Sequence, residues 1–189
     1  QAAADGTTPL SAASLTGKVG CVRLMIAAGA AVNQADSGGF TPLYAACQQG
    51  HIECARLLRD AGASVDQATE IGCTPLYIAC QQGHLECVQL LLEAGAAVSQ
   101  AADGGFTPLI VACRSGHLEV AKLLSSYGAS RAAVPPFGTP EEIANRKGHA
   151  DLAAWLVASH GWTPLQHLEA FLRLAAEGVS ALSSRPLPL

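Results

Sequence analysis

The sequence predicts an all-α solenoid, a row of short helix pairs in which each pair is one structural repeat. The first observation is a fixed period: the prolines of a recurring Thr-Pro-Leu motif stand 33 residues apart, at Pro9, Pro42, Pro75 and Pro108. The second is that each of the first four copies has glycine at two constant positions, where helices would end. Self-similarity at a fixed period of this length indicates stacked repeats rather than one globular core.

The second copy shows how one repeat is built. The hydroxyl of Thr41 can cap a helix whose first residue is Pro42, a position where the missing N–H of proline costs nothing. This helix should end near Gly50, and a second one should run from about His51 to Gly62, because glycine readily takes the positive φ of a helix stop. Each helix has about ten residues and would be unstable alone in water. A single copy therefore cannot fold without neighbours that cover its apolar faces.

The segment between the second helix of one copy and the next Thr-Pro-Leu motif is polar and contains glycine. Such composition predicts an extended turn or hairpin. We expect one of these to project from the stack between each pair of copies.

Several motifs recur in register, and together they resemble the ankyrin-repeat family. Beside Thr-Pro-Leu they are the Gly-His pairs that begin at Gly50, Gly83, Gly116 and Gly148, and the Gly-Ala pairs that begin at Gly29, Gly62, Gly95 and Gly128. The resemblance covers the chain from Gln1 to about Gly161. The family's signature histidine after Thr-Pro-Leu is replaced by Ser11, Tyr44, Tyr77 and Ile110. This departure concerns local hydrogen bonding and leaves the expected fold unchanged.

We expect one ankyrin-repeat domain over residues 1–182, followed by a loose tail at 183–189. Its repeats would lie at about 1–33, 34–66, 67–99, 100–132 and 133–161, with a degenerate C-terminal capping unit at 162–182. The fifth repeat is altered: Pro140 follows Pro108 by 32 residues, and Glu141 and Glu142 replace the Leu-Tyr pair. Carboxylates in the first turn complement the helix dipole, and we expect both to face water.

Composition argues against two classes of partner. Half of the residues are hydrophobic, 14% are charged and the formal net charge is −4, with Lys and Arg scattered singly. Binding of nucleic acid through its phosphates is therefore disfavoured. No apolar run approaches the ~20 residues that cross a bilayer, so no membrane segment is expected. The predicted module is monomeric.

Two stretches suggest a metal site at first sight, because cysteine and histidine alternate as Cys47-x3-His51-x2-Cys54 and again from Cys80. Zinc would use such ligands. The alternative is packing: these residues recur because the repeat recurs, and Val120 continues the buried column that Cys21, Cys54 and Cys87 form on the second helices. Free cysteine behaves as a small hydrophobe. We therefore predict packing, with no metal and no cofactor.

The chain has seven cysteines at repeat positions rather than in a disulfide pattern. Unpaired thiols suit a reducing compartment, so an intracellular location, cytoplasmic or nuclear, is expected. Cys73 is the exception, because it lies in a predicted turn where the adjacent copies have Phe40 and Phe106. We expect Cys73 to be an exposed thiol.

No enzyme is predicted. The histidines of the Gly-His pairs lack a recurring nucleophile or carboxylate beside them, so a structural role at the start of the second helix is favoured over general-base catalysis. Phosphate-binding glycine loops, nucleophile elbows and paired-carboxylate sites are also missing from the sequence.

The residues that vary between copies give a candidate protein-binding surface. By similarity to ankyrin repeats, the turn tips and exposed ends of the first helices line a concave side where partners usually bind. The candidate residues on this side are Phe40, Gln48, Gln49, Ile71, Cys73, Gln81, Gln82, Phe106, Arg114 and Ser115. Two aromatics flanking an isoleucine, edged by glutamines, suit an interface centre. The alternative is that the two phenylalanines only cover the bases of their turns.

We therefore expect a non-enzymatic module that presents a rigid concave surface to another protein. A second hypothesis belongs to a different class. Gln1 occupies the same repeat position as Gln34, Gln67 and Gln100, so the chain opens inside a predicted turn. On this ground the array would be the targeting or scaffold portion of a larger enzyme or membrane protein.

Overall fold

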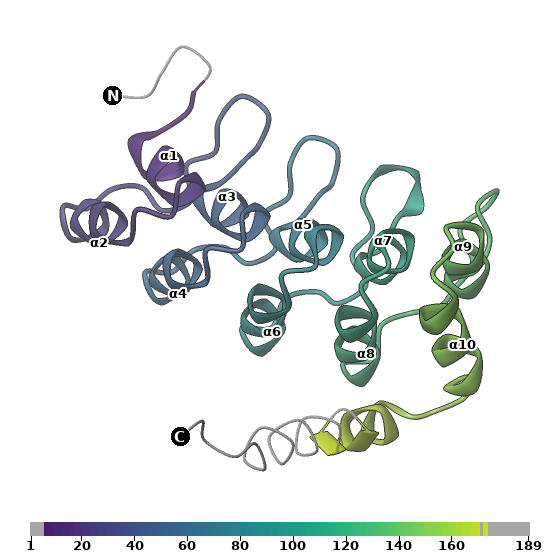
Figure 1. The fold of residues 1–189 in the computed structure, drawn as a ribbon. Helices are drawn as coiled ribbons and strands as arrows, with labels where there is room; N and C mark the ends of the chain where they lie inside the picture. The colour runs from purple at the N-terminus through teal and green to yellow at the C-terminus, as the bar shows by residue number, and fades with distance from the viewer. Residues whose placement is uncertain (1–5, 171, 174–189) are drawn as a thin grey trace, which may run out of the picture.

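Five consecutive helix pairs form a stack in the computed structural model, which describes residues 6–170, 172 and 173. The first members of the pairs, called the inner helices, are α1 (Pro9–Leu15), α3 (Pro42–Gln48), α5 (Pro75–Gln82), α7 (Pro108–Ser115) and α9 (Pro140–Arg146). The second members, called the outer helices, are α2 (Val19–Ala27), α4 (Ile52–Asp60), α6 (Leu85–Glu93), α8 (Leu118–Ser126) and α10 (Ala150–Ala158). Figure 1 shows them as two parallel rows, with loops projecting beyond the inner row. The predicted all-α solenoid is confirmed.

Each inner helix begins as the Thr-Pro motif predicts. The threonine hydroxyl accepts a hydrogen bond from the backbone N–H three residues later, and proline follows as the first helical residue. The capping residues are Thr8, Thr41, Thr74, Thr107 and Thr139. These caps satisfy donors that have no partner within the helix, and each contributes about 1 kcal/mol.

The hydrophobic core runs along the stack between the two rows. Leu43, Leu76 and Leu109 occupy the same position of three successive repeats and are all 0% exposed. Each inner helix packs against its neighbours in the row and against its own outer helix, whereas outer helices contact one another more sparsely. A fully buried leucine contributes roughly 1.5–3 kcal/mol, so stability comes mainly from contacts between repeats.

A histidine at the start of each outer helix from α4 onward joins two repeats. Its Nε2–H donates to a carbonyl oxygen at the end of the inner helix of the preceding repeat, over 3.1–3.2 Å. The pairs are His51 with Leu15, His84 with Gln48, His117 with Gln81, and His149 with Arg114. The imidazole lies against the glycine that ends that helix. A Cβ atom on Gly83, for example, would lie 2.5 Å from Nδ1 of His117. The predicted structural role of these histidines is confirmed.

The projecting loops are short hairpins, which we call finger loops. Backbone N–H groups close them by bonding to a carbonyl four residues on, in the loops 36–40, 69–73, 102–106 and 134–138. Neighbouring finger loops are also joined, because Glu70 N–H donates to Gly38 O over 3.3 Å and Asp103 N–H to Ile71 O over 3.0 Å. The predicted extended turns are therefore present, and they form a continuous row.

A further periodic set of hydrogen bonds joins the segments that follow the outer helices of successive repeats. The side chains of Asn33, Asp66 and Ser99, which are spaced by one repeat length, accept backbone N–H groups of the following repeat. Their donors are Ser64, Ala97 and Ser130, over 2.8–3.0 Å. With the histidine bonds and the finger-loop bonds, these contacts fix each repeat to the next at several separated points.

The fifth repeat differs from expectation at Glu141. Its side chain is only 17% exposed and lies 4.0 Å from the guanidinium of Arg131, so the prediction that it faces water is wrong. The loop before α9 places Arg131 beneath the first turn of that helix, where the cation attracts the carboxylate. Glu142 is exposed as expected and forms a capping box with Thr139.

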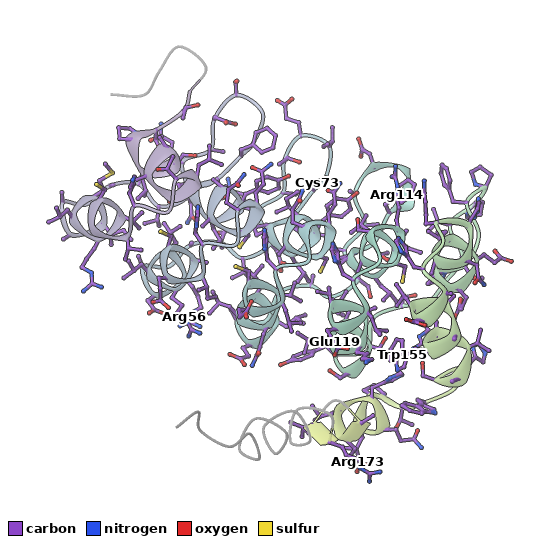
Figure 2. All side chains as sticks on the ribbon, viewed as in Figure 1. Arg56, Cys73, Arg114, Glu119, Trp155 and Arg173 are labelled. Atoms are coloured by element: carbon purple, nitrogen blue, oxygen red, sulfur yellow. The ribbon has the colours of Figure 1, made fainter. Side chains whose placement is uncertain are left out.

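A final helix begins after Thr163, whose backbone N–H donates to Oε1 of Gln166 over 2.8 Å. It lies against α10 through His167, whose ring is 5.5 Å from that of Trp155 and 5.3 Å from that of Trp162. Figure 1 shows that this helix does not extend the inner row, and Figure 2 shows Trp155 of α10 beside it. The rest of the predicted capping unit, 174–182, and the tail 183–189 lie outside the described residues.

The glycine–histidine contact predicts a difference between two glycines of the same repeat. Gly83 and Gly95 both have positive φ, +79° and +85°, but only Gly83 faces a neighbouring side chain within 4 Å. Gly95→Ala should cost about 1 kcal/mol for the left-handed backbone alone, and Gly83→Ala about 1–3 kcal/mol more because of the clash. Urea unfolding followed by circular dichroism measures both. Equal losses would contradict the contact, and adding His117→Ala should relieve part of the Gly83→Ala loss.

The contacts of His167 predict that docking of the final helix onto α10 depends on pH. Burial and the nearby Arg131 lower the pKa of this histidine, and its Nδ1 is buried without a hydrogen-bond partner within the described part of the chain. The folded state therefore favours the neutral ring. Docking should be fully stable above the unfolded pKa of about 6.5 and weaken as pH falls through the lower folded pKa.

Tryptophan fluorescence reports on this docking directly, since both tryptophans of the chain contact His167. We expect a spectral transition below about pH 6.5 that is lost in His167→Asn. The matched variant His160→Asn, at an exposed position, should keep it. A transition that survives His167→Asn would refute the assignment.

Candidate protein-binding face

The predicted binding residues come from the finger loops and from the C-terminal ends of inner helices. Gln49, Gln81, Gln82 and Arg114 are exposed, and Ile71 is 58% exposed at the tip of its finger loop. Gln48 and Ser115 are half-buried. The finger loops of successive repeats project beyond the inner row in the same direction in Figure 1. Equivalent positions of successive repeats therefore follow one another along the stack, the loop tips in one row and the ends of the inner helices in another.

Phe40 partly covers its own repeat. It is 38% exposed and stands edge-on to the ring of Tyr44, with centroids 5.0 Å apart and an interplanar angle of 68°. Tyr44, which replaces the family's signature histidine, is buried, and this burial raises the pKa of its hydroxyl to about 12. Its hydroxyl therefore stays neutral near pH 7. Phe40 thus has both an exposed edge for contact and a packing role.

Cys73 does not have the exposure expected of it. Its side chain is 7% exposed, and burial raises the pKa of the thiol. Its backbone N–H donates to the Thr69 hydroxyl over 3.1 Å. This bond holds Cys73 at the base of the finger loop. The prediction of an exposed thiol is wrong, because the sequence does not show how closely this loop packs on the next one, where Gly72 adjoins Ala102.

Phe106 lies against an aromatic that sequence reasoning left out. Its ring is 4.9 Å from that of Phe137, which belongs to the next finger loop and is 41% exposed. The two rings line a cavity of about 410 Å³ between α7 and α9. Its remaining lining residues are Arg114, Ile143, Arg146 and Lys147. The sequence signal for Phe137 was the altered lead-in of the fifth repeat, which places a phenylalanine after two prolines.

The electrostatic character of this side changes along the stack. In the second and third repeats, the ends of the inner helices carry Gln48 and Gln81. The equivalent positions in the fourth and fifth repeats, six residues after the helix-starting proline, are Arg114 and Arg146. One end of the face is therefore neutral and hydrogen-bonding, and the other is basic.

The cysteines are arranged for packing. Among the residues that the structure describes, no group of three or more His, Cys, Asp or Glu side chains could hold a metal ion. A hydrogen bond with Cys87, together with burial, raises the pKa of the Cys47 thiol well above its ordinary value. Burial also raises the pKa of Cys113 to about 12. These thiols are neutral apolar contacts near pH 7.

Cys21 departs from its predicted place in the buried column. It is exposed, although Cys54 and Cys87 at the equivalent positions are buried. The reason is its position at the end of the array: α2 has an outer-helix neighbour on one side only, which is α4.

Comparison with protein families identifies the repeat. A family model described as ankyrin repeats (3 copies) matches residues 1–69 and 61–133. The chain belongs to the ankyrin-repeat family. Ankyrin repeats are generally protein–protein interaction modules, and the family is typically non-enzymatic. A comparison with curated proteins found no match. In the described part of this ankyrin-repeat chain, no helix has the length and apolarity needed to cross a membrane.

The burial pattern predicts which thiol reacts first. In the native protein, iodoacetamide should label Cys21 at least about tenfold faster than the other six cysteines, because those are buried. Peptide mapping by mass spectrometry after timed quenching measures each rate. All seven should react in denaturant, which provides the control. Native labelling of Cys73 at the rate of Cys21 would contradict the burial described above.

Proposed function

We propose that this ankyrin-repeat chain is a non-enzymatic protein-binding module. Its binding face is the side formed by the exposed parts of the second to fourth repeats. The residues assigned to this face are Phe40, Gln48, Gln49, Ile71, Gln81, Gln82, Phe106, Arg114 and Ser115. The observation that carries the proposal is that exposed and half-buried side chains that differ between repeats extend from a framework whose repeats are fixed to one another.

The framework supports binding through preorganisation. Histidine–carbonyl bonds, backbone bonds between finger loops and the Asn33-type links hold each repeat in place before a partner arrives. Association therefore does not have to order the backbone of the face, and the entropic cost of binding falls. Side chains that extend from such a framework can differ between repeats without changing the fold.

The chemistry of the face favours a protein partner. Ile71 is exposed in its finger loop, the exposed glutamines at the inner-helix ends can donate and accept hydrogen bonds, and the centres of protein interfaces are depleted of charged residues. The formal net charge of −4 gives no general attraction for nucleic acid. The partner we propose is therefore a protein surface with an apolar centre and a polar surround.

Cysteine usage supports an intracellular place for this interaction. All seven cysteines are free, and six of them are buried. Buried unpaired thiols persist in reducing compartments, whereas extracellular domains generally form disulfides.

A paired-variant capture experiment tests the function. The test variant combines Gln49→Ala, Ile71→Ala and Gln81→Ala on the binding face. The control combines Gln89→Ala and Glu93→Ala on α6 in the outer row, whose side chains bond to each other over 2.8 Å. All five side chains are exposed, so neither variant should lose more than about 1 kcal/mol of folding free energy.

Cell extracts passed over the parent and both variants are compared by quantitative mass spectrometry. We expect a protein retained by the parent and by the α6 control, and reduced about tenfold or more by the binding-face variant. Retention that falls equally in both variants, or in neither, would count against the binding face.

A further inference from the structure

The cavity between α7 and α9 combines an apolar interior with a cationic rim. Phe106 and Phe137 form its walls, and Ile143, only 5% exposed, closes its floor. Arg114 and Lys147 are exposed at its edge. At about 410 Å³ it lies within the range of small ligand pockets, roughly 300–1,000 Å³, and is large enough to seat one bulky side chain. Figure 2 shows Arg114 on the side of α7 that faces the finger loops.

The basic groups of this rim form no ion pair with an acidic side chain among the described residues. In the part that the structure describes, the ion pairs involve Arg56, Arg59, Lys122 and Arg131, and none involves Arg114, Arg146 or Lys147. Of the two carboxylates of α9, Glu141 faces Arg131 and Glu142 accepts from the backbone N–H of Thr139. Three of the eleven Lys and Arg residues thus gather at one cavity of an otherwise acidic protein.

A purely structural role does not account for these cations. Cations near a helix C-terminus complement the helix dipole, which would explain Arg114 and Arg146 in part. The equivalent positions of the second and third repeats are Gln48 and Gln81, however, although the helix lengths are the same: 7 residues in α3 and α9, and 8 in α5 and α7. Arg146 has an additional task, since its guanidinium donates to the carbonyl oxygen of Phe137 and so positions the aromatic wall. The exposed charges of Arg114 and Lys147 remain without a structural use.

We infer that this cavity docks an acidic segment of a partner protein. One aromatic or branched aliphatic side chain of the segment enters between Phe106 and Phe137, and flanking carboxylates pair with Arg114 and Lys147. The inference rests on the proposed protein-binding function and names the chemistry of the partner. Guanidinium groups bind carboxylates through paired hydrogen bonds, and buried aromatic and arginine side chains supply most of the energy of interfaces.

Charge complementarity selects this occupant over a purely apolar one. An apolar side chain alone would fill the cavity but leave the rim cations unpaired, whereas an acidic segment uses both features. Opposite charge also speeds association and excludes basic competitors. The anchor and its neighbours need only a few residues of extended chain, which fits a cavity open to solvent at the exposed ends of α7 and α9.

The test uses the full chain and a fluorescein-labelled peptide, Gly-Ser-Asp-Glu-Phe-Glu-Asp-Ser-Gly, with fluorescence anisotropy as the readout. Two further peptides replace the central Phe with Ser, or the four acidic residues with their amides. The test variant is Arg114→Glu with Lys147→Glu. The matched control is Lys18→Glu with Arg23→Glu, which makes the same change of charge at two exposed positions at the other end of the stack.

We expect the acidic peptide to bind the parent and the control alike, and the test variant about tenfold or more weakly. Each altered peptide should also lose about tenfold, and raising salt from about 50 mM to about 300 mM should weaken binding of the acidic peptide. Phe137→Ala, at a 41% exposed position, should lower affinity without unfolding the chain.

Several outcomes would overturn the inference. One is equal affinity of the test variant and the control for the acidic peptide; another is equal binding of the amide peptide. Displacement of the peptide by 3-phenylpropionate at equal concentration would indicate a small-molecule site instead. Self-association of the parent that the test variant abolishes, without peptide binding, would indicate a second copy of the chain as occupant.

The same variants separate this inference from the proposed function. A captured protein that depends on Ile71 and its neighbouring glutamines, but not on Arg114 and Lys147, would overturn the acidic-segment inference and leave the binding function standing. A captured protein lost from both variant sets supports both. Peptide binding that meets every expectation above supports the cavity even when capture shows no dependence on the binding face.

Discussion

The close approach of consecutive repeats is the constraint on which the rest of the structure depends. Glycine ends the inner helix because no Cβ fits beside the imidazole of the next repeat, as the 2.5 Å separation at Gly83 shows. That imidazole in turn bonds to the inner-helix carbonyl. The spacing set here allows Leu76 and its equivalents to be completely buried. Since no single repeat encloses its own leucines, the core exists only along the row.

This arrangement separates the residues that build the stack from those that face a partner. The structural contacts use the Thr-Pro corner, the two glycines, the histidine and the small residues of the inner helices. At the ends of these helices and at the finger-loop tips the contacts between repeats use backbone groups, so the side chains there can change from neutral at Gln81 to basic at Arg114 without moving the backbone. A rigid repeat framework with a variable surface is a physical basis for recognition without catalysis.

The fifth repeat shows what happens when the regular pattern changes. Its shortened lead-in carries Phe137 against Phe106, and its cations extend the basic end of the face. On its other side, Arg131 bonds to Leu156 O and Ser159 Oγ, pairs with Glu141 and lies over the ring of Trp155. The end of the array is thus held by a polar cluster, where the middle repeats use regular apolar contacts.

The sequence by itself determined the repeat, its helix pairs, the threonine caps and the packing role of most cysteines, because these follow from local patterns that recur every 33 residues. It also indicated which side chains vary on one side of the stack. Only the tertiary structure decided that Cys73 is buried, that Cys21 is exposed, that Glu141 turns to Arg131 and that Phe106 meets Phe137. Each of these depends on a contact with a different repeat or on the lack of one at the end of the row, and such contacts leave no signal within a single repeat.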